Sequence, residues 1–431
     1  MTGVQEMRVY IISAAYPPEA VTAAGTACDI AEAMTQRGHE VTVFTPFPNR
    51  PTGKVMPGYQ RSLRQVEHRD GYRIIYSWHT LSKRSTLASR MTENVSFGIT
   101  STLQVMREPT PDVVYMNTWP IFAQWMNMVV LSHRRVPVMC AVKDLYPETL
   151  SNIGRISQNN PIIWLTKAIG TQVYRQSTLI APLNPLMREY IITDRGIHPG
   201  KIRVLSDWID ASHFPRHQPK DGSFRKKHAF SSELFLAMYV GSMTYMAGLE
   251  LYVATAERLR HRQDIRLLLV GDGAMRETIE GAIRQKALEN IQVIYPLKPE
   301  EVAEVQAAAD VLLLSLLPGA AEHATPSKLI FYMFSQRPVL ASVHAGSSPA
   351  RIIQDAKCGY IIRQGDPKEL ATKLEQMADD RTSLQQLGEN SRRYAEENFL
   401  KDNILPRVCN LLEQIAHPDS HANDGTGCCL T

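Results

Sequence analysis

The segment His323–Ser342 contains a helix start whose residue types suit a bound phosphate. Thr325 is a common N-cap residue, Pro326 is common at the first helical position, and Ser327 and Lys328 follow in the first turn. The unpaired N–H groups and positive dipole of a helix start attract anions, and Lys328 adds a formal charge. An ordinary capped helix with a solvated lysine has the same residues. The motif alone therefore leaves both interpretations open.

Length and composition limit the number of domains and the classes of ligand that the protein is expected to have. The chain has 431 residues, which is long for one compact core and natural for two domains. Its net charge of +4 gives no reason to expect nucleic acid as a partner. The six cysteines show no metal-ligand spacing, and no D-x-D motif that could hold Mg²⁺ beside a diphosphate is present. We expect a cytoplasmic protein without a metal or other cofactor.

Short apolar runs alternate with helical patterns along most of the chain. This alternation is typical of α/β folds with mostly parallel sheets that are covered on both faces. Residues 211–232 interrupt it, because they are rich in Pro, His, Lys and Arg and lack apolar periodicity. The sequence thus predicts, in order, an N-terminal Rossmann-like domain (1–210), a linker (211–232), a second Rossmann-like domain (233–398), a C-terminal helix that returns to the first domain (399–418) and a disordered tail (419–431).

In doubly wound sheets, ligands bind beyond the carboxyl ends of the strands. With two such domains facing each other, we expect the ligand between them. Without any comparison to known families, the sequence thus predicts a two-domain α/β protein. We expect this protein to be an enzyme that binds a phosphate-bearing ligand.

Nine motifs in a fixed order resemble the family 4 glycosyltransferases, which have the GT-B fold of two facing Rossmann-like domains. The resemblance is greatest to bacterial sugar transferases of surface polysaccharides that carry P-S-K-L. The motifs are YPPEAVTAAG (16–25), PDVVYMN (111–117), KDLYPETL (143–150), RVLSDWIDASHF (203–214), YVGSMTYMAGLE (239–250), LLVGDGAMRETIE (268–280), AADVLLLSLLP (308–318), PSKL (326–329) and CGYIIRQGDPKEL (358–370).

This resemblance implies a retaining glycosyltransferase that needs no metal. Its donor is a nucleotide-diphosphate sugar, and its acceptor is a glycan or a lipid-linked sugar. Because transfer leaves a diphosphate anion, the enzyme must supply positive potential at the leaving group. The donor-binding residues that the resemblance implies are Gly25, Thr26, Gly241, Ser242, Gly271, Asp272, Thr325, Ser327, Lys328 and Phe331.

Several positions depart from the family pattern. The loop after the first strand of the second domain usually carries an Arg and a Lys, which are Ser242 and Ala247 here. Two carboxylates usually near the donor are replaced by His323 and Phe331. With the loop charges missing, Lys328 becomes the best remaining phosphate ligand. These losses also support an alternative, a non-catalytic homologue that acts as a binding or partner subunit.

The candidate catalytic residues lie in the first domain, at the ends of predicted strands. Asn117 stands where many family members have a His, and an amide can bond to a sugar hydroxyl but cannot accept its proton. Asp144 and Glu148 follow the strand at 136–142. We expect Asp144 to orient or deprotonate the acceptor hydroxyl. The alternative is an Asp that caps the next turn.

Two features suggest peripheral contact with the inner membrane face. Arginines are frequent between residues 61 and 90, and anionic headgroups attract such runs. In the segment Met91–Met106, apolar residues recur on one helical face (Met91, Val95, Ile99, Leu103 and Met106). A buried core helix produces the same periodicity, so the pattern alone does not distinguish the two.

Overall fold

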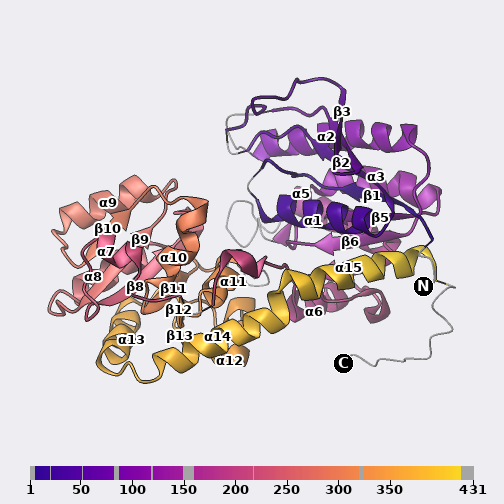
Figure 1. Cartoon of the computed structure of the whole chain (residues 1–431). Coiled ribbons are helices and arrows are strands. Elements are labelled where there is room, and N and C mark those ends of the chain that lie inside the picture. Colours follow the sequence, from indigo (N-terminus) through magenta and orange to yellow (C-terminus); the bar gives the residue numbers. More distant parts are fainter. Residues whose placement is uncertain are drawn as a thin grey trace, which may run out of the picture. The chain divides into compact units, whose positions relative to one another are not determined.

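The computed structural model describes residues 5–19, 21–50, 52–81, 87–117, 120–148, 160–216, 218–319 and 325–418. The chain forms two compact units (Figure 1). Unit 1 comprises residues 1–207 and 404–431, and unit 2 comprises residues 208–403. The predicted tail at 419–431 and His323 lie outside the described residues. Both units are α/β, as predicted.

Unit 1 is built on a seven-stranded sheet in the order β3-β4-β2-β1-β5-β6-β7, parallel except for β3. Its strands are β1 (Arg8–Ile12), β2 (Glu40–Pro46), β3 (Arg64–Arg69), β4 (Tyr72–Ser77), β5 (Val113–Asn117), β6 (Val138–Val142) and β7 (Leu179–Pro182). Its helices are α1 (Thr22–Gln36), α2 (Leu87–Arg107), α3 (Ile121–His133), α5 (Pro161–Gln176), α6 (Pro185–Thr193) and η1 (Pro199–Lys201). The inner strands are mostly apolar and buried along nearly their whole length, because both faces of the sheet are covered.

Unit 2 has a six-stranded parallel sheet in the order β10-β9-β8-β11-β12-β13. Its strands are β8 (Phe235–Val240), β9 (Ile265–Val270), β10 (Ile291–Ile294), β11 (Val311–Ser315), β12 (Val339–Ser342) and β13 (Gly359–Ile362). Its helices are η2 (Ala211–His213), α7 (Ser223–Lys227), η3 (Tyr245–Ala247), α8 (Glu250–Arg258), α9 (Arg276–Gln285), η4 (Pro299–Glu301), α10 (Val302–Ala307), α11 (Ser327–Phe334), α12 (Ser348–Ala356), α13 (Pro367–Asp379) and α14 (Leu384–Phe399).

The last helix, α15 (Lys401–Ala416), belongs to unit 1 from Ile404 onward. Its Glu413 carboxylate pairs with Arg37 at 3.0 Å and with the His39 imidazole at 3.1 Å. The His39 side chain is fully buried. A segment from the end of the chain thus completes the polar surroundings of a residue near its beginning.

The stretch 211–232, predicted as a linker, is instead part of unit 2. Phe214 and Phe224 lie in the hydrophobic core of that unit. Arg225 is 1% exposed and donates to the Asp310 carboxylate at 2.7 Å. Composition suggested a solvated connector because the charged residues mask two buried aromatic anchors and one buried ion pair.

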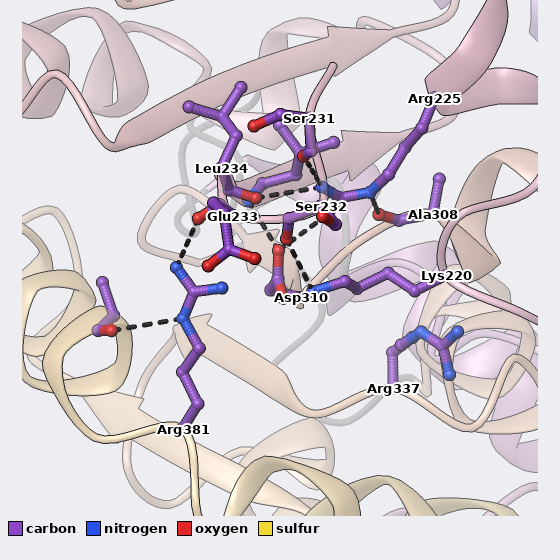
Figure 2. A network of polar contacts seen from close by, with 12 residues as sticks. Lys220, Arg225, Ser231, Ser232, Glu233, Leu234, Ala308, Asp310, Arg337 and Arg381 are labelled. Atoms are coloured by element: carbon purple, nitrogen blue, oxygen red, sulfur yellow. Dashed lines mark hydrogen bonds and ion pairs between the residues drawn. The ribbon is translucent and has the colours of Figure 1, made fainter.

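Figure 2 shows how this stretch is fixed through Asp310, a buried carboxylate at the start of β11. Lys220 donates to Oδ1 of Asp310 at 2.8 Å. The backbone N–H of Leu236 donates to Oδ2, the oxygen that Arg225 also binds, at 2.8 Å. Arg225 also donates to the carbonyls of Ala308 and Ser231. The Asp310 carboxylate thus pairs with both cations, and its pair with Arg225 lies away from bulk water.

Replacing Asp310 by alanine is expected to lower the free energy of unfolding by about 3–5 kcal/mol, because the Arg225 guanidinium would remain buried without its counter-ion. Urea denaturation of unit 2 measures the change. The control is Arg216→Ala, which breaks an ion pair with Glu396 at the surface, where the Arg216 side chain is 65% exposed. That control is expected to cost less than about 1 kcal/mol. Equal losses in both variants would contradict the assigned role of the buried pair.

Candidate functional site

Unit 2 contains a cavity of about 810 Å³ beyond the carboxyl ends of β8 and β11. A ligand of nucleotide size fits this volume. The wall is mostly apolar, with a few hydroxyl, amide and charged groups. Its residues are His213, Phe214, Tyr239, Val240, Gly241, Ser242, Thr244, Met246, Ala247, Leu297, Pro299, Glu300, Val302, Ala303, Gln306, Leu314, Ser315, Leu316, Pro326, Ser327, Lys328 and Phe331.

Lys328 is the only lysine or arginine among the described residues of this wall. Its Nζ lies 3.5 Å from the centre of the Tyr239 ring, a cation–π contact. Desolvation lowers the pKa of Lys328 to about 7, although part of the side chain remains accessible. An ammonium held in such surroundings gains most from an arriving anion, because water screens it poorly.

The Gly241 loop lies directly against this lysine. A Cβ at Gly241 would sit 2.9 Å from Cε of Lys328, and the backbone φ of 137° also favours glycine. Ser242 lines the cavity, and its carbonyl accepts from the Tyr239 hydroxyl at 2.6 Å. Ala247 also lines the cavity. At the two positions where family members usually carry an Arg and a Lys, this chain therefore presents uncharged side chains to the cavity.

Gly271 and Asp272 do not line the cavity but support its loop from behind. A Cβ at Gly271 would come within 2.2 Å of the Gly241 carbonyl oxygen, so glycine permits the close approach of the two turns. The Asp272 carbonyl accepts from the N–H of Met243 at 2.8 Å. The G-D-G turn therefore positions the Gly241 loop, and Gly271 and Asp272 are not part of the cavity wall.

Helix α11 begins one residue later than the sequence predicted, which was Thr325 as the N-cap and Pro326 as the first helical residue. Pro326 occupies the N-cap position, Ser327 is the first helical residue, and no side chain caps the helix. Thr325 does not cap because its hydroxyl lies 2.9 Å from that of Ser348. Ser327 and Lys328 nonetheless both line the cavity, and so does Phe331, whose ring packs on Phe214 at 5.6 Å.

In unit 1, the predicted donor-binding residues Gly25 and Thr26 lie near the start of α1, where the backbone is helical. The helix starts at Thr22 because the small residues before Gly25 are compatible with helical backbone. A Cβ at Gly25 would meet nothing within 4 Å, so no neighbour requires glycine there. Gly25 is exposed and Thr26 is buried.

Asn117 is the last residue of β5 and Asp144 follows β6, and these two strands are adjacent in the sheet. The Asn117 amide donates to the Ser13 hydroxyl at 3.0 Å, and its Oδ1 has no partner among the described residues. Asp144 is exposed. Desolvation by the protein around it and the nearby Asp207 carboxylate raise the pKa of Asp144 to about 6, against the opposing effect of Lys143. A carboxylate of this pKa is suited to proton transfer near neutrality.

Glu148 faces a different environment from Asp144. Both of its oxygens lie 2.7 Å from the same nitrogen, NH2, of Arg195, and Oε1 also accepts from the Tyr190 hydroxyl at 2.8 Å. The Arg195 side chain is fully buried. Breaking such a pair leaves an unpaired buried charge, so these contacts favour a structural role for Glu148 over the predicted catalytic one.

Among the polar residues of the cavity wall that sequence reasoning missed are His213, Glu300 and Gln306. Glu300 lies in η4 and is exposed, so its carboxylate is available to a ligand. Gln306 accepts from the Ser335 hydroxyl at 2.5 Å. A Pro-Glu-Glu segment after a strand was the only signal for Glu300, and it is equally typical of an ordinary helix start.

The described part of the chain contains no cluster of three or more His, Cys, Asp or Glu side chains that could hold a metal ion. None of its described helices combines the length and the apolar character that crossing a membrane requires.

Two family models match the chain in sequence order. The model described as "Glycosyl transferase 4-like domain" matches residues 23–208. The model described as "Glycosyl transferases group 1" matches residues 221–394. Between them they extend across most of both units.

A curated relative is the probable glycosyltransferase WbjE of Pseudomonas aeruginosa, which is 22% identical over 259 residues. The match covers 60% of this chain and 63% of the relative, so the chain spans less than two thirds of the relative's length.

Solved structures share the fold. Sucrose-phosphate synthase from Thermosynechococcus elongatus superposes with a TM-score of 0.74 at 18% identity, covering 95% of this chain and 99% of the other. HepE from Anabaena, in complex with UDP-glucose, gives a TM-score of 0.68 at 13% identity over 95% and 100% of the two chains. Both family models, the two doubly wound units and these likenesses agree: the chain belongs to the GT4-type glycosyltransferases of the GT-B fold.

Proposed function

We propose that this protein transfers a sugar from a nucleotide-diphosphate donor to a hydroxyl of a glycan or lipid-linked sugar in surface polysaccharide biosynthesis. The observation that carries the proposal is Lys328, a cation at a helix start in an otherwise largely apolar cavity of nucleotide size. Retention of configuration and independence from metal are the parts of the proposal that rest on family resemblance alone.

Lys328 and the backbone of the Gly241 loop would bind the diphosphate. The leaving group gains negative charge as the sugar bond breaks, and Lys328 would stabilise that charge where water is largely excluded. The Tyr239 ring beneath the ammonium keeps it in place without neutralising it. One buried lysine would thus take over the role that two loop charges have in other members.

Glu300 is the carboxylate of the wall that could accept hydrogen bonds from ribose hydroxyls, since Phe331 cannot. Phe331 instead offers an aromatic surface to the ligand. HepE was crystallised with UDP-glucose, which supports a nucleotide-sugar as the donor class.

Asp144 would orient the acceptor hydroxyl and take its proton, while Asn117 would hold a sugar hydroxyl. The acceptor would bind to unit 1 beyond the carboxyl ends of β5 and β6. We place the reaction in the cytoplasm, at the inner face of the membrane when the acceptor is lipid-linked.

The second candidate is a non-catalytic binding subunit. Ser242, Ala247 and Phe331 face the cavity in place of the charged family residues, and this favours weak donor chemistry. The two candidates differ in turnover, because a binding subunit would bind a nucleotide without releasing nucleoside diphosphate from a nucleotide-sugar.

A thermal-shift screen of the full chain against nucleoside diphosphates and nucleotide-sugars tests the proposal. We expect stabilisation by one base class, with RT ln(1 + [L]/Kd) giving about 2.7 kcal/mol at a hundredfold excess over Kd. The donor that binds is then assayed for release of nucleoside diphosphate with added glycan acceptors. Binding without release supports the non-catalytic candidate, and a complete lack of binding across the panel overturns both.

A further inference from the structure

Strands β8 and β11 are neighbours in the sheet of unit 2, but their pairing stops before either strand ends. On the side of β8 it is limited to Ala237 and Met238, whereas β8 stays paired with β9 as far as Val240. Val240 and Leu314, which would face each other if the same register continued, both line the cavity. The cavity therefore opens where the two strands separate.

This separation leaves the backbone of Val240 without a partner strand. The N–H of the next residue, Gly241, donates to the Val270 carbonyl of β9. Because successive residues of a strand direct their backbone groups to opposite edges, the N–H and C=O of Val240 point toward the side of β11. Val240 is buried, so its backbone groups need a partner within the protein.

The hydroxyl of Tyr332 supplies both missing partners. It accepts from the Val240 N–H at 2.8 Å and donates to the Val240 carbonyl at 3.1 Å. Tyr332 belongs to α11 and is fully buried. A side chain of this helix thus takes the place of β11 at the point where the strands part.

Helix α11 contacts two consecutive residues of β8. Lys328 and Tyr332 are four residues apart, so they lie on neighbouring turns of one helix face. Lys328 lies over the Tyr239 ring, and Tyr332 binds the next residue, Val240. The loop that follows packs closely on the lysine, since a Cβ at Gly241 would lie 2.9 Å from Cε of Lys328. The position of the strand end therefore determines how the loop and the lysine meet.

We propose that Tyr332 is a positioning residue of the donor site: its hydroxyl holds the end of β8 apart from β11 and thereby places the Gly241 loop against Lys328. This role rests on the proposed function, because that function makes the cavity the site of a nucleotide-diphosphate donor. Tyr332 is not among the residues that line the cavity, so it acts through Val240 and the loop. A purely structural tyrosine would contribute to stability and leave the loop and the lysine unchanged.

Tyr332→Phe tests this role, because it removes the hydroxyl and keeps the ring in the core. The matched control is Tyr10→Phe in unit 1. Tyr10 is also fully buried, and its hydroxyl donates to the Pro109 carbonyl at 2.6 Å, so the control removes a comparable hydrogen bond from the other unit. Circular dichroism and urea denaturation of the full chain compare the folding and the stability of the two variants.

Two measurements need no donor. In hydrogen exchange followed by mass spectrometry, the segment 239–248 should exchange about tenfold faster in Tyr332→Phe, since the strand end loses its partner. NMR of carbon-13-labelled lysine should show that the pKa of Lys328 rises from about 7 toward 10.5, because a relaxed loop admits water. Neither quantity should change in Tyr10→Phe. Unchanged exchange or an unchanged Lys328 pKa in Tyr332→Phe would overturn the proposal. Unfolding of this variant would overturn it too, since a hydroxyl that only positions a strand end is dispensable for the fold.

Isothermal titration with UDP, GDP and ADP measures the effect on binding. We expect the Kd of the nucleotide that binds to rise about tenfold in Tyr332→Phe and by less than about twofold in Tyr10→Phe. In the Lys328→Ala background, Tyr332→Phe should raise the Kd by less than about threefold, because Tyr332 acts through the lysine and its loop. Additive losses would contradict this coupling and overturn the proposal. If none of the three nucleotides binds the wild type while the exchange and the Lys328 pKa change as expected, the proposed function fails and the positioning role of Tyr332 stands.

Discussion

Lys328→Ala is expected to lower kcat/KM for the nucleotide-sugar by about 10²–10³-fold, because it removes the one lysine or arginine that the described residues place in the cavity wall, at the proposed site of the leaving diphosphate. The donor dissociation constant should rise in parallel, since the ground-state diphosphate loses the same charge. Isothermal titration and initial rates measure the two effects. The control is Lys298→Ala, an exposed lysine next to the cavity that does not line it. An unchanged donor affinity in Lys328→Ala would refute the phosphate assignment.

The pH dependence of donor binding should carry the signature of Lys328. Its pKa is about 7 in the empty cavity, and a bound diphosphate raises it again. Above pH 7 the donor therefore binds with uptake of a proton, and its affinity should fall by up to about tenfold per pH unit. Titrations in buffers of different ionisation enthalpy detect the proton, and Lys328→Ala should abolish the uptake.

Lys328→Met separates function from stability. In the unfolded chain this lysine has the ordinary pKa of 10.5, and folding lowers its pKa to about 7, so charging it opposes folding. The free-energy penalty of folding with a charged Lys328 is therefore fully present below about pH 7 and disappears as the pH rises toward 10.5. In the absence of donor, Lys328→Met should unfold at higher urea than the wild type near neutral pH, yet fail to bind donor. A less stable methionine variant would indicate a structural lysine.

Asp144→Asn is expected to reduce kcat by about 10²–10⁴-fold with little change in donor affinity, because an amide can orient the acceptor hydroxyl but cannot take its proton. In the wild type, activity should rise between about pH 5 and 7, since the pKa of Asp144 is about 6 and the deprotonated form is the active one. The rising limb should be missing in the variant.

Asp70→Asn provides the matched control, because it makes the same change in an exposed turn between β3 and β4. It should keep wild-type rates and the wild-type pH profile. If Asp144→Asn retained full activity at all pH values, the capping interpretation of Asp144 would hold instead. If it lost activity only through unfolding, circular dichroism would show it.

Periodicity predicted most elements of both sheets, since buried parallel strands are short apolar runs that stand out from amphipathic helices. Strands β3 and β13 and helix α3 are among the elements that it did not predict. Strand β3 is a polar edge strand whose residues alternate between exposed and half-exposed, and β13 has only four residues. Helix α3 is apolar on nearly every side, so it shows no helical period.

The candidate site was predicted in part. Helix-start and loop motifs pointed to Ser327, Lys328 and Gly241, which the fold gathers around one cavity. Glu300 and the stacking of Lys328 on Tyr239 could not be foreseen, because they join segments far apart in sequence. The contact of Glu148 with Arg195 was also hidden, since 47 residues separate the two and neither belongs to a recognisable pairing motif.

The discontinuity of unit 1 bears on the order of folding during synthesis. Unit 2 is one continuous segment, residues 208–403, and can fold as soon as it leaves the ribosome. Unit 1 begins first but cannot finish before unit 2, because Glu413, the counter-ion of Arg37 and His39, is made after residue 403. The nascent N-terminal sheet must therefore persist with one helix missing while nearly 200 residues are added, the interval between Asp207 and Ile404. During that interval it is the part of the molecule most exposed to chaperones and to aggregation.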